Sequence, residues 1–273
     1  MKRLYVPILL MILLAGCAGS GKPKTAEAFI ERGISFALQA EYGKAIEDFS
    51  EAIRLSPNMG MAYILRGRAY YASVSNVTDT ADNFSSVRIV SNGGRPSPKQ
   101  TAAFDLAAAD FTQAIRFNPN YAKTYIERGN TYDEKGDYEK AIADYDKVID
   151  LEPKSAEAYI NRGLSYFYRN AVDRSFADYS QAIQLDPNDT RAYINRGIAY
   201  YSGSDFDSAI TDFSKAINLD SGNATAYYYR GTTYFTVGNF EQAITDYETS
   251  LRLNPNNPSA GKYLDEARKA QAR

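Results

Sequence analysis

The stretch AYINRG stands at residues 158–163 and again, 34 positions later, at 192–197. Looser copies read AFIERG at 28–33, AYILRG at 62–67, TYIERG at 124–129 and AYYYRG at 226–231. All six copies place an arginine directly before a glycine. A period of roughly 20 to 50 residues is typical of a chain built from stacked repeats, in which each repeat packs only against its neighbours.

The repeated blocks run from residue 26 to residue 257. In the third block, Gly129 and Ala141 are small, which lets two helices approach closely, and Pro153 ends the second helix because proline cannot extend its hydrogen bonds. Length and pattern resemble the tetratricopeptide repeat. The resemblance implies an all-α fold, a right-handed superhelical solenoid of six helix pairs. The pairs are expected at 26–59, 60–121, 122–155, 156–189, 190–223 and 224–257, with an insertion in the second at about 73–100.

Two further segments complete this plan. Residues 258–273 predict a capping helix, in which Tyr263, Leu264 and Ala267 would cover the exposed edge of the last pair. The insertion at about 73–100 is rich in Ser, Asn, Gly and Pro. A long segment of this kind is either a functional surface loop or a disordered one, and the sequence leaves both interpretations open.

The N-terminus reads MKRLYVPILLMILLAGC, with two positive residues, an apolar run and then small residues before Cys17. The run from Leu4 to Ala15 suits a signal peptide and is too short to span a bilayer. Residues 14–17, LAGC, resemble the lipobox of bacterial lipoprotein precursors. The resemblance implies a signal peptide at 1–16 that is removed, and an acylated Cys17 with a flexible tether at 17–25. It also implies a lipid anchor in the bacterial envelope, on the outer membrane facing the periplasm. An ordinary secretory signal with an incidental cysteine is the alternative.

The composition argues against several classes of function. Histidine is absent, Cys17 is the sole cysteine, and the formal net charge is −2. The chain therefore has no histidine for acid–base catalysis and no zinc site of the usual kind. It also has no net positive charge that would attract nucleic acid. The sequence predicts a protein that is not an enzyme, with no catalytic residue, no cofactor, no metal and no nucleic-acid partner.

The six arginines occupy the seventh position of each block, where the resembled family most often has leucine. A buried cation needs a partner, because burying an unpaired charge is costly. An aspartate recurs with the same period, 16 positions later except across the insertion. We therefore expect structural ion pairs between helices of the same or the preceding block, and arginines displayed to an acidic ligand are the alternative. The pairs are expected to join Arg32, Arg66, Arg128, Arg162, Arg196 and Arg230 with Asp48, Asp110, Asp144, Asp178, Asp212 and Asp246.

The resemblance also implies a concave groove lined by the first helix of each pair. Asn161 and Asn195 stand at the same groove-facing position of successive blocks. They are similar to the asparagine ladder of O-GlcNAc transferase repeats, which holds peptide backbones. A carboxamide can donate and accept at once, as a main-chain amide requires. Polar residues on a solvated face are the alternative interpretation.

Aromatic residues beyond those of the repeat pattern add to the expected peptide-binding groove. Exposed aromatics are unusual without a partner, although packing against neighbouring helices or the insertion is the alternative. Blocks one and three instead carry acidic residues at groove positions, among them Glu127 and Glu134. The aromatic groove residues are expected to be Tyr71, Phe167, Tyr168, Tyr201, Tyr228, Tyr229 and Phe235.

These features favour a membrane-tethered, non-enzymatic adaptor whose groove binds an extended peptide or a helix of an envelope protein, for assembly or scaffolding of an envelope complex. In plan the chain resembles the six-repeat pilotin lipoproteins that help assemble pilus secretins. A small apolar ligand held for a transport system is the second possibility, which a closed apolar pocket in the last three pairs would favour. A glycan hydrolase with paired carboxylates is the third.

Overall fold

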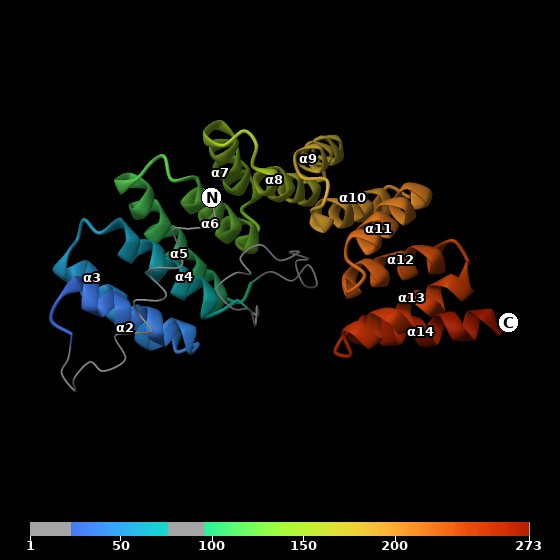
Figure 1. Ribbon diagram of the computed structural model, residues 1–273, viewed down its shortest axis with the longest axis horizontal. Helices are drawn as coiled ribbons and strands as arrows, with labels where there is room; N and C mark the ends of the chain where they lie inside the picture. The colour runs from blue at the N-terminus through green and yellow to red at the C-terminus, as the bar shows by residue number, and fades with distance from the viewer. Residues whose placement is uncertain (1–22, 76–95, 273) are drawn as a thin grey trace. The chain divides into compact units, whose positions relative to one another are not determined.

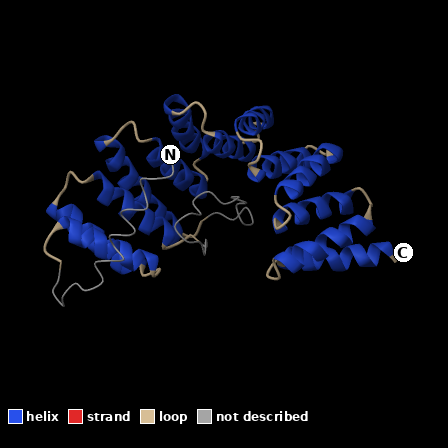
Figure 2. Cartoon of the chain, viewed as in Figure 1, coloured by secondary structure: helices blue, strands red, loops and turns tan. Residues whose placement is uncertain are grey.

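The computed structural model describes residues 23–75 and 96–272, so that Cys17, the leader and most of the predicted insertion lie outside the described residues. Within these ranges the chain forms thirteen helices and no strand (Figure 1; Figure 2). The prediction of an all-α fold built from helix pairs is confirmed.

The chain divides into two compact units, and the division falls between the two helices of the third predicted pair. The first unit contains α2 (Ala26–Leu38), α3 (Tyr42–Leu55), α4 (Gly60–Ala72), α5 (Pro98–Phe117) and α6 (Ala122–Lys135). The second contains α7 (Tyr138–Leu151), α8 (Ala156–Tyr168), α9 (Val172–Leu185), α10 (Thr190–Ser202), α11 (Phe206–Leu219), α12 (Ala224–Thr236), α13 (Phe240–Leu253) and α14 (Pro258–Gln271).

Four first helices of the pairs and the capping helix begin at polar capping residues, whereas α4 and α6 begin at Met59 and Tyr121 without a side-chain cap. A side-chain oxygen of the residue before the helix accepts a hydrogen bond from a main-chain N–H of the first turn, which has no partner within the helix. Each cap of this kind stabilises the helix by about 1 kcal/mol. The capping residues of α2, α8, α10, α12 and α14 are Thr25, Ser155, Asp189, Asn223 and Asn257.

The turn from the first to the second helix of a pair contains one residue with left-handed backbone. Its φ lies between 57° and 79°, a region that glycine adopts without the steric cost that a Cβ atom brings. Because the position is the same in the five pairs whose turn is described, a periodic glycine would be expected there, but three of these pairs use other residues. The five residues are Ala40, Gly136, Asn170, Ser204 and Gly238.

Helix α5 starts inside the predicted insertion and is longer than the other second helices. It has 20 residues, whereas α3, α9, α11 and α13 have 14 each. Ser97 and Gln100 form a capping box at its start, and the Gln100 side chain also donates to the main-chain oxygen of Val74 at 3.3 Å. The predicted boundary at residue 100 is therefore wrong by one helical turn, because the cap at Ser97 starts the helix earlier.

Helix α14 covers the last pair, as the sequence predicts. Leu264 and Ala267 are buried against α13, and the Tyr263 ring stacks on Tyr247 with ring centroids 6.2 Å apart.

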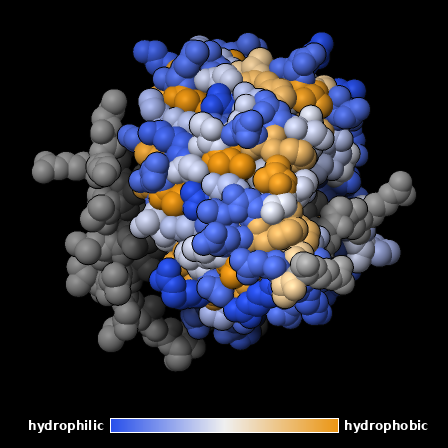
Figure 3. Space-filling model, turned by 90° about the vertical axis from the view of Figure 1, so that its right-hand side faces the viewer, coloured by the Kyte–Doolittle hydropathy of each residue, from blue (hydrophilic) through white to orange (hydrophobic). Residues whose placement is uncertain are grey.

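On the face of the molecule drawn in Figure 3, apolar side chains form small patches separated by polar ones. A polar outer surface on the terminal helix is what keeps a stacked repeat array soluble.

Candidate protein-binding site on the first helices

A hollow in the second unit brings together four of the predicted groove residues. Its volume is about 50 Å³, and it is lined by side chains of α8, α10 and α12 and by Tyr179 of α9. Its walls are mostly apolar and aromatic, as in protein sites that receive an apolar side chain. The lining residues are Leu164, Phe167, Tyr168, Tyr179, Asn195, Ile198 and Tyr229, of which Phe167, Tyr168, Asn195 and Tyr229 were predicted from the sequence.

Asn195 provides a carboxamide in this otherwise mostly apolar and aromatic lining. Its side chain belongs to a residue only 5% exposed, and its carboxamide makes no hydrogen bond to the described residues. Asn195 contributes no atom to the fully buried, unpaired polar groups of the described residues, so its carboxamide keeps contact with solvent at the hollow and is open to pair with a ligand. The expectation of an asparagine on a solvated face is nonetheless wrong for Asn195, because helices of the neighbouring pairs enclose most of it.

Asn161, the other predicted rung, is also buried, at 8% exposed. Its main-chain oxygen accepts a hydrogen bond from the Ser165 hydroxyl at 3.1 Å, and it has further interactions within the chain. It does not line the hollow. The structure therefore brings one of the two asparagines to the candidate site and places the other in the frame.

Tyr229 closes the hollow from α12. Burial raises the pKa of its hydroxyl to about 12, so that the group stays neutral over the physiological range. Its ring stacks on Phe213, with ring centroids 5.8 Å apart, which fixes the ring against the core of the neighbouring pair. A neutral, rigidly held tyrosine provides apolar contact area at low entropic cost, as is common where proteins bind peptides.

The other predicted aromatic residues lie elsewhere. Tyr228 and Phe235 pack against the cluster that α13 and α14 form, and the Tyr201 hydroxyl shares a hydrogen bond of 3.0 Å with Thr236. Tyr71, in the first unit, is 7% exposed and packs on Phe104. None of these four lines the hollow, although the Tyr228 ring contacts Tyr229 with ring centroids 5.1 Å apart. Tyr201, Tyr228 and Phe235 are half-buried within the second unit and Tyr71 lies in the first unit, so that their part in a groove stays a prediction.

Five of the six expected ion pairs are present. In each, Nε and Nη2 of the arginine donate to the two carboxylate oxygens of the aspartate at 2.7–2.9 Å, with the aspartates 3–5% exposed. Arg128 and Asp144 belong to different units, and their pairing stays a prediction. The five pairs are Arg32–Asp48, Arg66–Asp110, Arg162–Asp178, Arg196–Asp212 and Arg230–Asp246.

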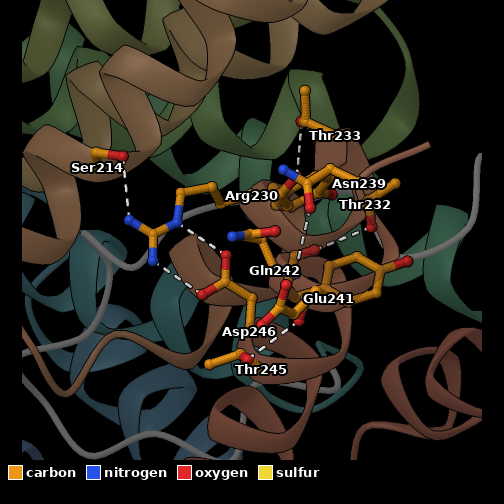
Figure 4. A network of polar contacts seen from close by, with 11 residues as sticks. Ser214, Arg230, Thr232, Thr233, Asn239, Glu241, Gln242, Thr245 and Asp246 are labelled. Carbon is orange, nitrogen blue, oxygen red and sulfur yellow. Dashed lines mark hydrogen bonds and ion pairs between the residues drawn. The ribbon is translucent and has the colours of Figure 1, made fainter. Parts of the chain in front are cut away.

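A second acceptor for the same arginines was not predicted from the sequence. Nη1 donates to a side-chain oxygen 16 positions earlier, on the second helix of the preceding pair, at 2.6–3.3 Å. Figure 4 shows this arrangement around Arg230, which lies between Asp246 and Ser214. A signal was present, because a hydroxyl or carboxylate residue recurs with the repeat period. The acceptors are Ser50, Thr112, Asp146, Ser180 and Ser214.

Two aromatic rings flank each arginine along its own helix, three residues before and four residues after it. The guanidinium carbon lies 5.4–6.0 Å from the ring centroids. The hydrogen bonds that Arg162 donates to Asp178 raise the pKa of Arg162 above its usual value, whereas burial raises the pKa of Asp178 itself. The arginines whose side chains are 19–21% exposed are thus largely desolvated parts of the frame, and the alternative of arginines displayed to an acidic ligand is wrong for them. The Arg32 side chain is paired with Asp48 in the same way but is 41% exposed.

The acidic groove residues of the third block also have internal partners. Glu127 is 2% exposed and forms an ion pair with Arg68, and Glu134 accepts from the Tyr71 hydroxyl at 3.3 Å. The charge of Glu127 is thus balanced by Arg68 of α4 within the first unit. Among the residues that the structure describes, there is no cluster of acidic, cysteine or histidine side chains that could hold a metal ion. None of the described helices is long and apolar enough to cross a bilayer.

Sequence profiles of the tetratricopeptide repeat match the chain. One described as TPR repeat matches residues 129–168, 163–203 and 199–238, and two described as tetratricopeptide repeat match residues 224–257 and 111–143. Together the matches extend from residue 111 to residue 257, which is more than half of the chain. No curated protein matches the sequence significantly.

Several solved structures are similar to the chain. The APC/C hetero-tetramer Cut9–Hcn1 has a TM-score of 0.68 at 18% identity and is matched over 96% of this chain and 45% of that chain, so the chain spans less than half of that relative. PilF of Pseudomonas aeruginosa has a TM-score of 0.63 at 13% identity over 88% of this chain and 97% of that one. MamA has a TM-score of 0.50 at 27% identity, over 57% of this chain and 92% of that one. The helix pairs, the repeat positions and the profile matches agree, and the chain belongs to the tetratricopeptide-repeat family.

Proposed function

We propose that the chain is a non-enzymatic adaptor that is anchored to a bacterial envelope membrane through an acylated Cys17. Its partner is an extended peptide or a helix of an envelope protein, and its task is the assembly or scaffolding of an envelope complex. The carboxamide of Asn195, which lines an aromatic hollow and makes no hydrogen bond to the described residues, is the observation that carries the binding site.

The hollow fits one apolar side chain of a bound peptide. At about 50 Å³ it is far smaller than the roughly 300–1,000 Å³ of a typical small-molecule pocket. A side chain that entered it would bring the peptide main chain beside α10. There the Asn195 carboxamide could donate to a peptide carbonyl and accept from a peptide N–H, which is the pairing that it lacks in the free chain. This size supports a peptide over a small apolar ligand held for transport.

The Asn195→Ala variant is expected to bind peptides about tenfold more weakly than the natural chain, because one buried hydrogen-bonding group is lost. The probes are peptides selected against the full chain from a random display library, with affinities measured by fluorescence anisotropy. The same variant is expected to be as stable as the natural chain or more stable, since it removes a polar group that the free chain leaves unpaired. Loss of binding with gain of stability is the mark of a residue that serves a ligand.

The matched control is Asn188→Ala, at an exposed asparagine in the loop before α10. It should leave peptide affinity unchanged. Equal affinity of Asn195→Ala and the natural chain for the selected peptides would show that the hollow is not the site. Pull-down from envelope extracts with residues 18–273 then tests the nature of the partner. A protein retained by the natural sequence and lost with Asn195→Ala supports the proposal, and retention by both contradicts it.

The Cys17→Ala variant tests the anchor. The natural chain is expected in the membrane fraction of a bacterial host and the variant in the soluble fraction, because several acyl chains on one residue give durable membrane binding. Mass spectrometry of the N-terminal peptide checks the same prediction through the mass of the attached lipid. A natural chain that carries no lipid on Cys17, or a variant that stays in the membrane fraction, would contradict the anchor and leave the Asn195 site untouched.

A further inference from the structure

The outer face of α2 differs from the same face of every later first helix of the pairs that the structure describes. In α4 this face packs against α3, where Ala62 lies against Ala52, and Ala69 against Ala45 and Phe49. Ala62 and Ala69 are 0% and 3% exposed. The corresponding residues of α2, Ala28 and Ser35, are only half-buried. The face of α2 is therefore built like a helix-docking face but has no helix of the described chain on it.

Arg32 shows the same difference in its charge contacts. Its Nε and Nη2 donate to Asp48 like those of the other arginines, but its Nη1 has no acceptor among the described residues. Its side chain is 41% exposed, against 19–21% for Arg66, Arg162, Arg196 and Arg230. In the later pairs this nitrogen donates to a hydroxyl or a carboxylate on the preceding helix. Nη1 of Arg32 is therefore accessible to an oxygen acceptor from another molecule.

The aromatic residues around Arg32 are more apolar than those of the inner pairs. Arg32 lies between the rings of Phe29 and Phe36, at 5.6 and 5.8 Å. Three residues before the arginine, the later first helices all have tyrosine, namely Tyr63, Tyr125, Tyr159, Tyr193 and Tyr227. Four residues after it they again have tyrosine, namely Tyr70, Tyr132, Tyr166, Tyr200 and Tyr234. Phe29 and Phe36 are half-buried, and each packs in part on the clusters that α3 forms with its neighbours. Without the tyrosine hydroxyls, the part of this face that stays exposed is more apolar than the same face of the inner helices.

The two ends of the array also differ in this respect. At the same two positions α14 has Gly261 and Arg268, and Leu264 replaces the arginine between them. In α14 the position of Leu264 faces α13, against which this side chain is buried. The capping helix therefore has no guanidinium at its contact with the preceding pair, whereas α2 keeps the arginine at the same position.

We propose that the face of α2 formed by Ala28, Phe29, Arg32, Ser35 and Phe36 binds an amphipathic helix of a protein partner. This helix presents small residues to Ala28 and Ser35, and a serine, threonine or aspartate to Nη1 of Arg32. The chain itself supplies the template, because α3 docks on α4 with Ala52 and Ala45 at the small residues and Ser50 at Arg66. The surface lies in the first unit and does not depend on the Asn195 hollow of the second.

A protein helix fits this face better than a membrane surface does. Asp48 already neutralises the charge of Arg32 through two hydrogen bonds of 2.7 Å. Glu27 and Glu31 are exposed on the same helix and would repel anionic lipid headgroups. What Arg32 lacks is one directed acceptor, which a helix side chain provides and a hydrocarbon surface does not.

The test uses a helix-stapled peptide with the sequence of residues 42–55, since a short peptide without a staple is not helical in water. The full chain carrying Cys17→Ala is titrated with the labelled peptide and the anisotropy is measured. We expect saturable binding with a Kd below about 1 mM, weakened about tenfold by Ala28→Arg and unchanged by Gly261→Arg, where α14 has open space at the Cβ. A peptide with Ser50→Ala should also bind about tenfold more weakly, and one with Ser50→Asp should bind as well as the original.

Ser35→Lys is the second blocking variant should Ala28→Arg fail to fold, and circular dichroism checks the fold of each. Equal binding by the blocked and the control variants, or equal binding of the Ser50→Ala peptide, would overturn the proposal. A dimer of the full chain that Ala28→Arg converts to a monomer in sedimentation would assign the face to a second copy instead. Binding to phosphatidylcholine–phosphatidylglycerol vesicles that Phe36→Ser abolishes would assign it to a membrane. Either result would replace the proposed occupant.

Discussion

Replacing Arg162 with alanine is expected to lower the free energy of unfolding of the second unit by about 3 kcal/mol. The change leaves Asp178 as a buried carboxylate without its partner, and removing one member of a buried pair exposes the full desolvation cost of the other. It also removes the contact that Arg162 makes with Asp146 of the preceding pair at 2.6 Å. Urea unfolding followed by circular dichroism measures the loss.

The double-mutant cycle with Asp178→Ala separates the pair from its surroundings. Asp178→Ala alone is expected to cost about 2 kcal/mol, less than Arg162→Ala, because Asp146 still balances the arginine. The double variant should lose clearly less than the sum of the two single losses, with a coupling of about 1–3 kcal/mol. Additive losses would show that the two side chains do not stabilise the fold as a pair.

The pair at the open end of the array is the natural control for this cycle. Arg32 and Asp48 have the same hydrogen bonds as Arg162 and Asp178, but the Arg32 side chain is 41% exposed, against 19% for Arg162. Water screens the more exposed pair, so the coupling between Arg32→Ala and Asp48→Ala should be below about 1 kcal/mol. The two cycles together measure how much the preceding pair of helices strengthens the ion pair.

Replacing Gly197 with valine is expected to destabilise the second unit by more than about 3 kcal/mol. A Cβ atom at Gly197 would lie 2.7 Å from Cε1 of Phe213, whose ring is fully buried in the core of the same pair. Valine adds two further carbon atoms at this contact, and a close-packed core has no space to receive them. The loss is measured by the same urea unfolding. A free energy of unfolding near that of the natural chain would contradict the close approach of α10 and α11.

Gly261→Val in α14 is the matched control. A Cβ atom there meets nothing within 4 Å, so the substitution adds no overlap. It is expected to leave stability unchanged or to raise it by less than about 1 kcal/mol, because glycine is the poorer helix former. The same substitution is thus expected to destabilise the chain at Gly197 of α10 but not at Gly261 of α14. The comparison distinguishes the effect of close packing from that of helix propensity.

The repeat, the helix pairs and the capping helix could be predicted from the sequence because they depend on local signals. The period of 34 residues, the capping residues such as Ser155 and Asn223, and the small residues at close approaches all act within one pair. The one boundary that was wrong, the start of α5, depends on Ser97 and Gln100 inside a segment whose composition indicated a loop.

The candidate site could be predicted only in part. Phe167, Tyr168, Asn195 and Tyr229 were identified by their repeat positions and do meet at the hollow. The same argument also selected Tyr228 and Phe235, which α14 covers, because the repeat position of a residue does not say whether a later element packs on it. Exposure depends on at least three helices at once, and no single window of the sequence contains that information.

The sequence by itself determined the all-α repeat architecture and the matched rows of arginine and aspartate, since both follow from a period that any one pair reveals. Only the tertiary structure decided the rest. Among the described residues, it directs Nη1 of each inner arginine to the preceding pair, gives Asn195 no hydrogen-bond partner at the hollow, and places no helix over the face of α2 around Arg32. These features arise where one pair meets the next. They are set by the packing of neighbouring pairs, and each changes at the ends of the array even though the repeated sequence stays nearly the same.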